Sequence, residues 1–399
     1  MIELKNVSKE FVSPKKYPGF KGAIKGLFSN EKVSKLAVDD ISFTIGSGEI
    51  VGYIGSNGAG KSTTIKMMTG ILNPSKGMCL VDGIDPSKNR KENAQNIGVV
   101  FGQRTQLWWD LPLSESFTIL KEIYDVSDEA YAEQMEFLNR VLELDEFFDR
   151  PVRTLSLGQR MRADLGAALL HNPKVLYLDE PTIGLDLVVK DNIRKAIKEI
   201  NEKYQTTVIL TTHDIGDIEE LCSRIIIIDE GKKIYDGTLE NLKDTYGKRR
   251  KVSMEVRKPE ALQNISLADL LNKTSISTLD AGEQQKGFDA GKKIQSAKIR
   301  TGIAVTEADY EAVLDVDNKS YTVIFDKHKI QVPQILSVVM ELTEVTDIKL
   351  QETELVEIVK EIYNKGSAEK IADIKHVERE SENNAAENHI KNPIKNGGN

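Results

Sequence analysis

The chain has 399 residues, of which 40% are hydrophobic and 29% charged, and its net charge is -8. This apolar content excludes a wholly disordered chain, and the acidic balance argues against a nucleic-acid binder that works through a basic surface. No apolar stretch approaches the roughly 18–20 residues of a membrane span, and the first residues lack the apolar core of a signal peptide. Cys79 and Cys222 offer no metal or disulfide spacing, as in cytoplasmic proteins.

The first part of the chain alternates between strand patterns and one basic segment. Residues 1–12 alternate apolar and polar side chains, which predicts a half-exposed strand. Residues 13–35 are rich in lysine and are interpreted as a basic surface insertion. Strands are expected at 37–45 and at 50–54, and the second of these runs into a glycine-rich loop.

The middle of the chain predicts an α/β fold. Apolar side chains recur at helical spacing across 115–148, which indicates a helical subdomain within residues 104–165. Short apolar runs at 175–178, 208–210 and 225–228 alternate with helical stretches, a pattern typical of a largely parallel sheet. Residues 1–245 are therefore expected to form one domain, with 13–35 as an insertion.

The pattern changes after residue 245. Residues 251–315 are polar and give no clear assignment. Further on, strand and helix patterns alternate and predict a small α+β accessory domain at 246–365; they lie at 321–325, 332–342, 348–350 and 354–363. The Glu-, Asn- and Lys-rich segment 366–399 is expected to be disordered.

A phosphate-binding loop is the strongest motif. Gly55–Ser62 matches G-x-x-x-x-G-K-[ST] between a predicted strand and a predicted helix at 62–69. Glycines let backbone N–H groups surround an anion, Lys61 reaches the β- and γ-phosphates, and the Ser62 hydroxyl binds Mg²⁺. A chance glycine-rich turn is the alternative. The candidate nucleotide-binding residues are Gly55, Ser56, Asn57, Gly58, Ala59, Gly60, Lys61, Ser62 and Thr63.

Two acids follow an apolar strand at 175–178. Asp179 is placed to hold Mg²⁺, and Glu180 is placed to polarise a water in line with the γ-phosphate. The alternative is that both acids simply end a strand before Pro181. A nucleotide loop needs a partner acid, which favours the catalytic interpretation.

With these sites the segment Leu155–Gln159 completes a set that resembles the ATP-binding cassette (ABC) family of ATPases, a P-loop NTPase fold. The segment is similar to the family signature LSGGQ, with Leu157 in place of the first glycine. The resemblance implies that Ser156, Gly158 and Gln159 bind the nucleotide of a partner subunit, so that two ATPase subunits, identical or different, form a dimer.

The resemblance also implies further site residues. Gln103 corresponds to the family glutamine that senses Mg²⁺ and the attacking water, with Gln106 as the alternative. Asp186 lies in the loop that crosses the dimer interface. His213 corresponds to the switch histidine that contacts the γ-phosphate and orients Glu180.

An aromatic side chain near the first strand stacks on adenine in this family. Phe11 is the candidate, and Tyr17 is its rival. Either ring is also consistent with ordinary packing, since stacking tolerates Phe or Tyr.

Segments 101–112 and 151–162 resemble a bacterial subgroup of ABC-2-type exporter ATPases that includes drug and viologen exporters. This implies a peripheral ATPase on the cytoplasmic face of the membrane, with ATP and Mg²⁺ as cofactors and separate transmembrane permease subunits as partners. Trp108 and Trp109 fall where the family docks those subunits, or else pack inside the helical subdomain. A soluble ABC ATPase of translation or DNA repair is the alternative function.

Overall fold

The computed structural model describes residues 1–15, 31–102, 105–263, 265–272 and 305–363. The chain divides into two compact units, Met1–Leu239 (unit 1) and Glu240–Asn399 (unit 2). Gln103, Tyr17 and the segment 366–399 lie outside the described residues.

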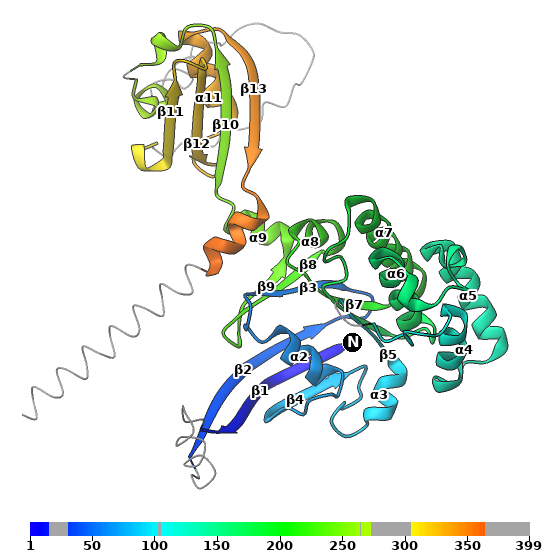
Figure 1. Ribbon diagram of the computed structural model, residues 1–399. Helices are drawn as coiled ribbons and strands as arrows, with labels where there is room; N and C mark the ends of the chain where they lie inside the picture. Colours follow the sequence, from blue (N-terminus) through cyan, green and yellow to red (C-terminus); the bar gives the residue numbers. More distant parts are fainter. Residues whose placement is uncertain (16–30, 103–104, 264, 273–304, 364–399) are drawn as a thin grey trace, which may run out of the picture. The chain divides into compact units, whose positions relative to one another are not determined.

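A six-stranded sheet forms the centre of unit 1 (Figure 1). Its order is β5-β6-β7-β3-β8-β9, and all neighbours pair in parallel except β8 and β9. The central strands are almost wholly buried, as expected for apolar runs covered on both faces. The strands are β3 (Ile50–Gly55), β5 (Ile97–Phe101), β6 (Val175–Asp179), β7 (Thr207–Thr211), β8 (Arg224–Asp229) and β9 (Lys232–Thr238). The predicted α/β class is confirmed.

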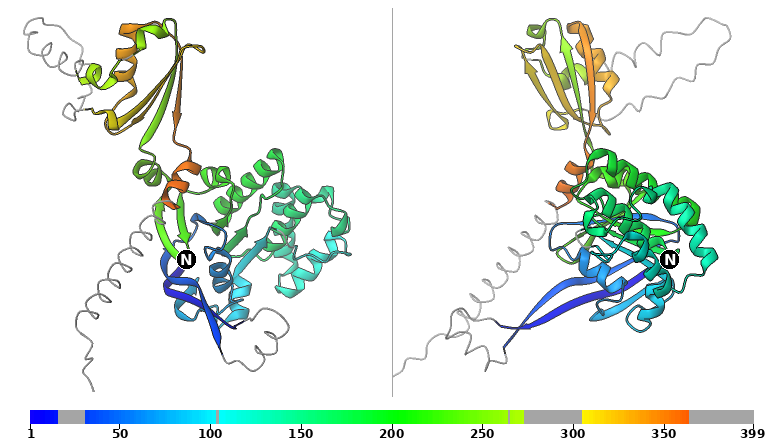
Figure 2. Two further views of the ribbon diagram at one scale, coloured as in Figure 1. Left: turned by 60° about the vertical axis from the view of Figure 1, so that its left-hand side comes forward. Right: turned by 45° about the vertical axis from the view of Figure 1, so that its right-hand side comes forward.

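A second sheet of unit 1 is antiparallel, in the order β2 (Lys32–Ile45), β1 (Ile2–Pro14) and β4 (Lys76–Val81). The β1–β2 hairpin extends beyond the rest of unit 1 in every ribbon view (Figure 2). Its pairing continues to Pro14 opposite Lys32, so both strands reach into the segment expected to be an insertion. Lysine-rich sequence hides this extension because both faces of the hairpin end meet water, which removes the apolar alternation that marks a strand.

Helices cover the six-stranded sheet of unit 1. Helix α6 begins with a capping box, in which Ser156 and Gln159 bond to each other's backbone N–H. Asp186 caps the N-terminus of helix α7, and its carboxylate accepts from the Val189 N–H. The helices are α2 (Lys61–Met68), α3 (Arg90–Asn96), α6 (Leu157–Leu169), α7 (Leu187–Tyr204) and α8 (Ile215–Leu221).

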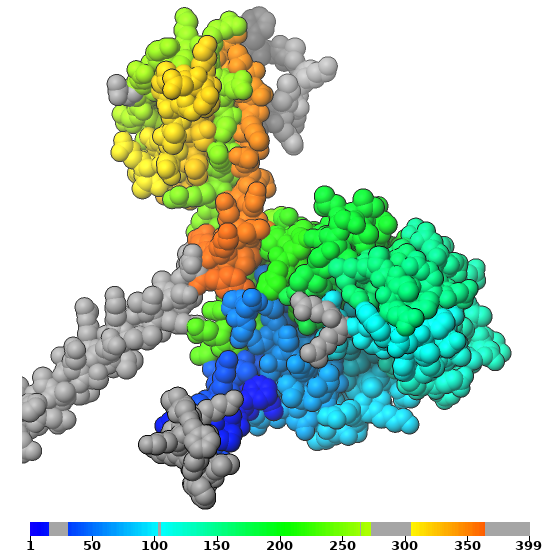
Figure 3. All heavy atoms as spheres, viewed as in Figure 1, coloured from blue at the N-terminus to red at the C-terminus, as the bar shows by residue number. Residues whose placement is uncertain are grey.

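The expected helical subdomain contains α4 (Leu113–Ile123) and α5 (Asp128–Leu142). Their apolar faces are buried through residues such as Phe117 and Leu138. In the space-filling view the atoms of these helices are continuous with the rest of unit 1 (Figure 3). Within the described ranges, every helix of the chain is too short or too polar to cross a lipid bilayer.

Unit 2 contains a four-stranded antiparallel sheet in the order β11-β12-β10-β13, with α11 against one face (Figure 2). The core joins Val252 and Met254 of the sheet to Ile335 and Val339 of α11. Helix α9 (Leu239–Thr245) precedes the sheet, and residues 355–363 are helical. The other elements are β10 (Arg249–Val256), β11 (Tyr310–Asp315), β12 (Ser320–Asp326), α11 (Val332–Leu342) and β13 (Val345–Glu352).

Candidate functional site

The loop between β3 and α2 has the backbone of an anion site. Gly58 and Gly60 adopt φ of 88° and 106°, the left-handed region that favours glycine. A Cβ atom at Gly60 would lie 2.6 Å from the Ala37 carbonyl oxygen, so a side chain does not fit there. The loop leads directly into α2, so its N–H groups and the positive end of the helix dipole act on the same region.

Lys61 lies over this loop. Its ammonium donates to the carbonyl oxygens of Gly55 at 2.6 Å and Ser56 at 3.2 Å, and the residue is 8% exposed. Burial lowers the pKa of Lys61, and the nearby charges of Glu180 and Asp179 oppose this shift. The loop therefore holds a largely desolvated cation facing two acids.

Asp179 and Glu180 end β6 beside the loop. The Thr211 hydroxyl donates to Asp179 Oδ1, and the Glu180 N–H donates to the Thr211 carbonyl at 2.9 Å. Glu180 adopts φ of 57°, a conformation that costs a non-glycine residue free energy and is common at active sites. The neighbouring strand β7 thus fixes both acids through one threonine.

His213 follows β7 and points at Glu180. Its Nε2 lies 3.0 Å from Glu180 Oε1. The side chains are 51% and 24% exposed, so both are accessible to a ligand. The sequence placed these residues 33 positions apart, and the sheet brings them into hydrogen-bond distance.

The loop, Lys61 and the two acids meet in a hollow of about 720 Å³. His213 is not in its lining and contacts it only through Glu180. The volume of the hollow suits a nucleotide-sized ligand. Among the expected residues, its lining includes Phe11, Ser56, Asn57, Gly58, Gly60, Lys61, Ser62, Thr63, Asp179 and Glu180. Gly55 and Ala59 complete the loop without lining the hollow, and Ala59 is buried.

The residues expected to bind a partner's nucleotide lie away from this hollow. Ser156, Gly158 and Gln159 at the start of α6 are not in its lining, and neither is Asp186. The Ser156 hydroxyl accepts from the Gln159 N–H at 3.2 Å. A Cβ atom at Gly158 would lie 2.9 Å from Val189 Cγ1, so the starts of α6 and α7 are in close contact.

The comparisons with known proteins agree with this geometry. The profile of the family "ABC transporter" matches residues 38–183. The ABC transporter ATP-binding protein NatA of Bacillus subtilis is 34% identical over 215 residues, which cover 54% of this chain and 87% of NatA. The chain belongs to the ABC transporter ATP-binding proteins.

Two further relatives define the type of ABC protein. The probable multidrug ABC transporter ATP-binding protein YbhF of Escherichia coli is 35% identical over 207 residues, covering 52% of this chain and 35% of YbhF. The dimeric post-hydrolysis structure of the cassette MJ0796 with ADP and Pi has a TM-score of 0.50 at 27% identity, covering 60% of this chain and 99% of that one. The chain is an ABC-type ATPase that resembles exporter ATPases, and the soluble translation or repair alternative is not supported.

Two expectations about this ABC ATPase concern the segment after β5. Gln103 is outside the described residues, and its alternative Gln106 does not line the hollow. The Gln106 N–H instead donates to the buried Asp164 at 3.1 Å. Trp108 and Trp109 are 37% and 49% exposed, so neither ring is enclosed in the helical subdomain.

The motifs did not indicate several residues of the hollow. Lys35 pairs with Phe11 across the β1–β2 hairpin, and both line the hollow. Only the register of the hairpin relates Phe11 to Lys35. The sequence predicts the second strand at 37–45, after Lys35, and so does not indicate this pairing. The remaining unexpected lining residues are Ala37, Lys66, Ile71, Phe101 and Gly102.

Proposed function

We propose that the chain binds ATP with Mg²⁺ and hydrolyses it to power export across the cytoplasmic membrane through separate transmembrane subunits. The observation that carries this proposal is that Glu180 lines the same hollow as the Lys61 loop, with His213 Nε2 3.0 Å from its carboxylate.

The phosphates of ATP bind at the loop. Its N–H groups and the start of α2 attract the negative charge, and Lys61 exchanges its carbonyl partners for phosphate oxygens. This exchange is favourable because a desolvated ammonium interacts more strongly with phosphate than with a neutral carbonyl. Because Lys61 lies close to Asp179 and Glu180, a γ-phosphate bound to Lys61 lies near these two acids.

The same hollow fits Mg²⁺. The Ser62 hydroxyl and the Asp179 carboxylate both line it, and these are the oxygen ligands that Mg²⁺ prefers. Among the described residues no larger cluster of metal-binding side chains exists, which suits an ion that completes its shell with phosphates and water. When bound, Mg²⁺ neutralises charge that develops on the phosphate oxygens.

Glu180 and His213 carry the hydrolytic step. Glu180 orients and polarises the attacking water, and His213 holds Glu180 and contacts the γ-phosphate. Lys61 stabilises the charge of the transition state. Catalysis is therefore mainly positioning and electrostatic stabilisation.

Two ATPase subunits complete two such sites. Ser156 and Gly158 lie at a helix start outside their own hollow, which suits an anion presented by another subunit. Asp186, at the start of α7, and Gln159 flank that surface. The cassette MJ0796 is a dimer with ADP and Pi bound, which supports a dimer of ATPase subunits here.

The adenine base stacks on Phe11 at the edge of the hollow. The ring is 41% exposed and lines the same hollow as the phosphate loop. Lys35, on the same face of the hairpin, adds a positive charge beside it. Aromatic stacking accepts any base, so this contact contributes affinity more than specificity.

The transmembrane subunits dock on the surface that contains Trp108 and Trp109, which makes the ATPase a peripheral protein of the cytoplasmic face. Exposed tryptophans are enriched in interface cores. The double variant W108A/W109A should still bind ATP and should no longer co-purify with membrane subunits from detergent-solubilised membranes. Unchanged co-purification would contradict this docking surface.

Substitution Glu180→Gln tests the hydrolytic role. The variant should bind ATP, accumulate as a dimer with ATP, and hydrolyse it roughly 10²- to 10⁴-fold more slowly, because an amide is a poor base. Glu202→Gln, an exposed position on α7, is the matched control and should keep the wild-type rate. Hydrolysis by Glu180→Gln at the wild-type rate would contradict the proposal.

A further inference from the structure

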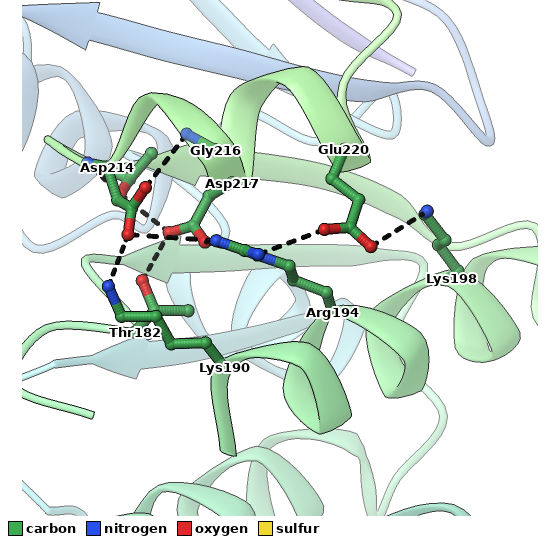
Figure 4. A network of polar contacts seen from close by, with 9 residues as sticks. Thr182, Lys190, Arg194, Lys198, Asp214, Gly216, Asp217 and Glu220 are labelled. Carbon is green, nitrogen blue, oxygen red and sulfur yellow. Dashed lines mark hydrogen bonds and ion pairs between the residues drawn. The ribbon is translucent and has the colours of Figure 1, made fainter. Parts of the chain in front are cut away.

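A buried carboxylate, Asp217 of α8, is at the centre of a network of polar contacts with Thr182 and Arg194 (Figure 4). Its side chain is 0% exposed. Its Oδ2 accepts from the Thr182 hydroxyl and, at 3.0 Å, from the Thr212 hydroxyl. Its Oδ1 accepts from Arg194 Nε at 2.7 Å. Nothing in the nucleotide hollow contacts this carboxylate, so direct binding of ATP does not explain it.

The two threonines belong to the segments that carry the catalytic pair. Thr182 lies two positions after Glu180, and Thr212 directly precedes His213. One oxygen atom of Asp217 therefore connects both segments. His213 is half exposed, so its position depends on the backbone that carries it, and Thr212 is the residue directly before it.

Helix α7 supports this carboxylate from the other side. Arg194 is 11% exposed and also pairs with Glu220 at 3.1 Å. Lys190, one turn earlier, donates to Asp214, the residue that follows His213. A buried charge is stable only when it is paired and hydrogen-bonded, so Asp217 and Arg194 hold each other in place. Both neighbours of His213 are thus tied to this network.

We propose that Asp217, supported by Arg194, is a positioning residue for ATP hydrolysis. It sets the separation of Glu180 and His213 without contacting ATP. A misplacement of about 1 Å in a reacting group can cost roughly 100-fold in rate, so a small relaxation of these segments is sufficient. The proposal rests on the proposed function of the Glu180–His213 pair.

Substitution Asp217→Asn tests it. The amide would turn N–H donors toward either Arg194 or the two hydroxyls, so at least one side of the network loses its acceptor. We expect kcat to fall roughly 10- to 100-fold. KM for ATP should change by less than about twofold, because the Lys61 loop is untouched.

A double-mutant cycle with His213→Ala separates positioning from general destabilisation. If Asp217 acts through His213, Asp217→Asn should slow His213→Ala no further, because residues that act as a unit are not additive. Asp236→Asn is the matched control. It breaks a half-buried ion pair with Arg224 in the same unit, 2.9 Å long, and should lower Tm without changing kcat.

A second pair of variants avoids loss of folding. Thr182→Val removes the hydroxyl but keeps the shape, whereas Thr182→Ser keeps the hydroxyl. Thr182→Val should lower kcat several-fold and Thr182→Ser should restore it. Equal kcat values in these two variants would overturn the proposal, even where Asp217→Asn fails to fold.

The failures of the two proposals differ. If His213→Ala is slow and Asp217→Asn reduces its kcat by the same factor as in the wild type, the positioning role is overturned and the catalytic pair stands. If His213→Ala hydrolyses ATP at the wild-type kcat, the role of His213 is overturned, and the positioning role with it.

Discussion

The described residues of each unit line a sizeable hollow, and these two hollows differ in chemistry. The hollow of unit 1, of about 720 Å³, is lined by left-handed glycines and a buried lysine. The hollow of unit 2 is larger, about 820 Å³, and charged side chains of both signs dominate its lining, among them Lys248, Arg249, Arg250, Lys251, Glu352, Glu354, Glu357 and Glu361. Size alone therefore does not identify the functional site. The difference lies in the backbone and in the desolvation of the charges.

The backbone shows the same contrast. Among the described residues every glycine with positive φ lies in unit 1, including Gly58 and Gly60 of the loop. Of the described non-glycine residues with positive φ, nine lie in unit 1, Glu180 of the site among them, and Lys319 lies in unit 2. This conformation costs a non-glycine residue free energy and is common at functional sites. We therefore expect the chemistry of the chain to lie in unit 1 and unit 2 to take no direct part in it.

Substitution Lys61→Ala in unit 1 should have the largest effect on ATP hydrolysis. Hydrolysis should fall at least about 100-fold, because removing one donor to developing negative charge costs 10²–10³ in rate. Binding of ATP should weaken too. Arg249→Ala, in the hollow of unit 2, should leave both quantities unchanged. Loss of ATP binding in Arg249→Ala would show that phosphate recognition is not confined to unit 1.

The core of unit 1's site was predictable because it depends on local sequence. A phosphate loop is contiguous, and an apolar run ending in Asp179 must place its acid at the edge of a parallel sheet. The histidine was predictable only through the family, and the structure places it 3.0 Å from Glu180. Short-range motifs and family patterns thus pointed to residues that the fold brings together, and their catalytic roles stay predictions.

The support around the site was not predictable in this way. Asp217 contacts Thr182 across 35 positions, and no local spacing relates them. The pairing of Phe11 with Lys35 depends on a hairpin register that lysine-rich sequence conceals.

In unit 2, β11 and most of β10 lie within residues 251–315, which gave no assignment. The edge strand β11 is largely exposed and lacks a buried face, whereas the alternation of Val252, Met254 and Val256 in β10 is a strand signal that was missed.

Substitution Met254→Ala tests whether the stability of unit 2 is independent of the chemistry of unit 1. Met254 is fully buried between β12 and β13, so the cavity should lower the free energy of unfolding of unit 2 by about 2–5 kcal/mol. Calorimetry measures this change. The kcat of the folded protein should stay at the wild-type value. Val313→Ala, at a 54% exposed position of the same sheet, is the control and should change stability little. A lower kcat in Met254→Ala would contradict the division.

Substitution Phe11→Ala tests the edge of the hollow in unit 1. Loss of stacking should weaken ATP binding by about 1 kcal/mol, roughly fivefold, because the ring is partly exposed. KM should rise while kcat stays constant, and Phe11→Tyr should behave as the wild type. Val12→Ala is the control, since Val12 is the next residue and does not line the hollow. If kcat falls with KM unchanged, Phe11 does not stack on the base.

The smallest expected effect is on the pH dependence of stability, which Asp164 in unit 1 and Asp309 in unit 2 change in opposite ways. Burial raises the pKa of Asp164 in unit 1 to about 6, although Thr105 and the Gln106 N–H donate to it. The folded state then binds more protons than the unfolded state, so this contribution to stability is present below pH 3.8 and is lost as the pH rises through about 6. Hydrogen bonds from Lys329 and Thr306 lower the pKa of Asp309 in unit 2 to about 2. The stability that Asp309 contributes is therefore present above pH 3.8 and is lost as the pH falls through about 2.

Substitution Asp164→Asn should remove the fall in Tm of unit 1 between pH 4 and 6, because the amide oxygen still accepts from both donors and does not ionise. The change should amount to a few degrees, at about 2–4 °C for each kcal/mol in a unit of this size. Asp309→Asn should leave the same slope unchanged, since Asp309 stays ionised over that range. If the Tm of Asp164→Asn still falls between pH 4 and 6 as in the wild type, Asp164 does not titrate near pH 6 in the folded protein.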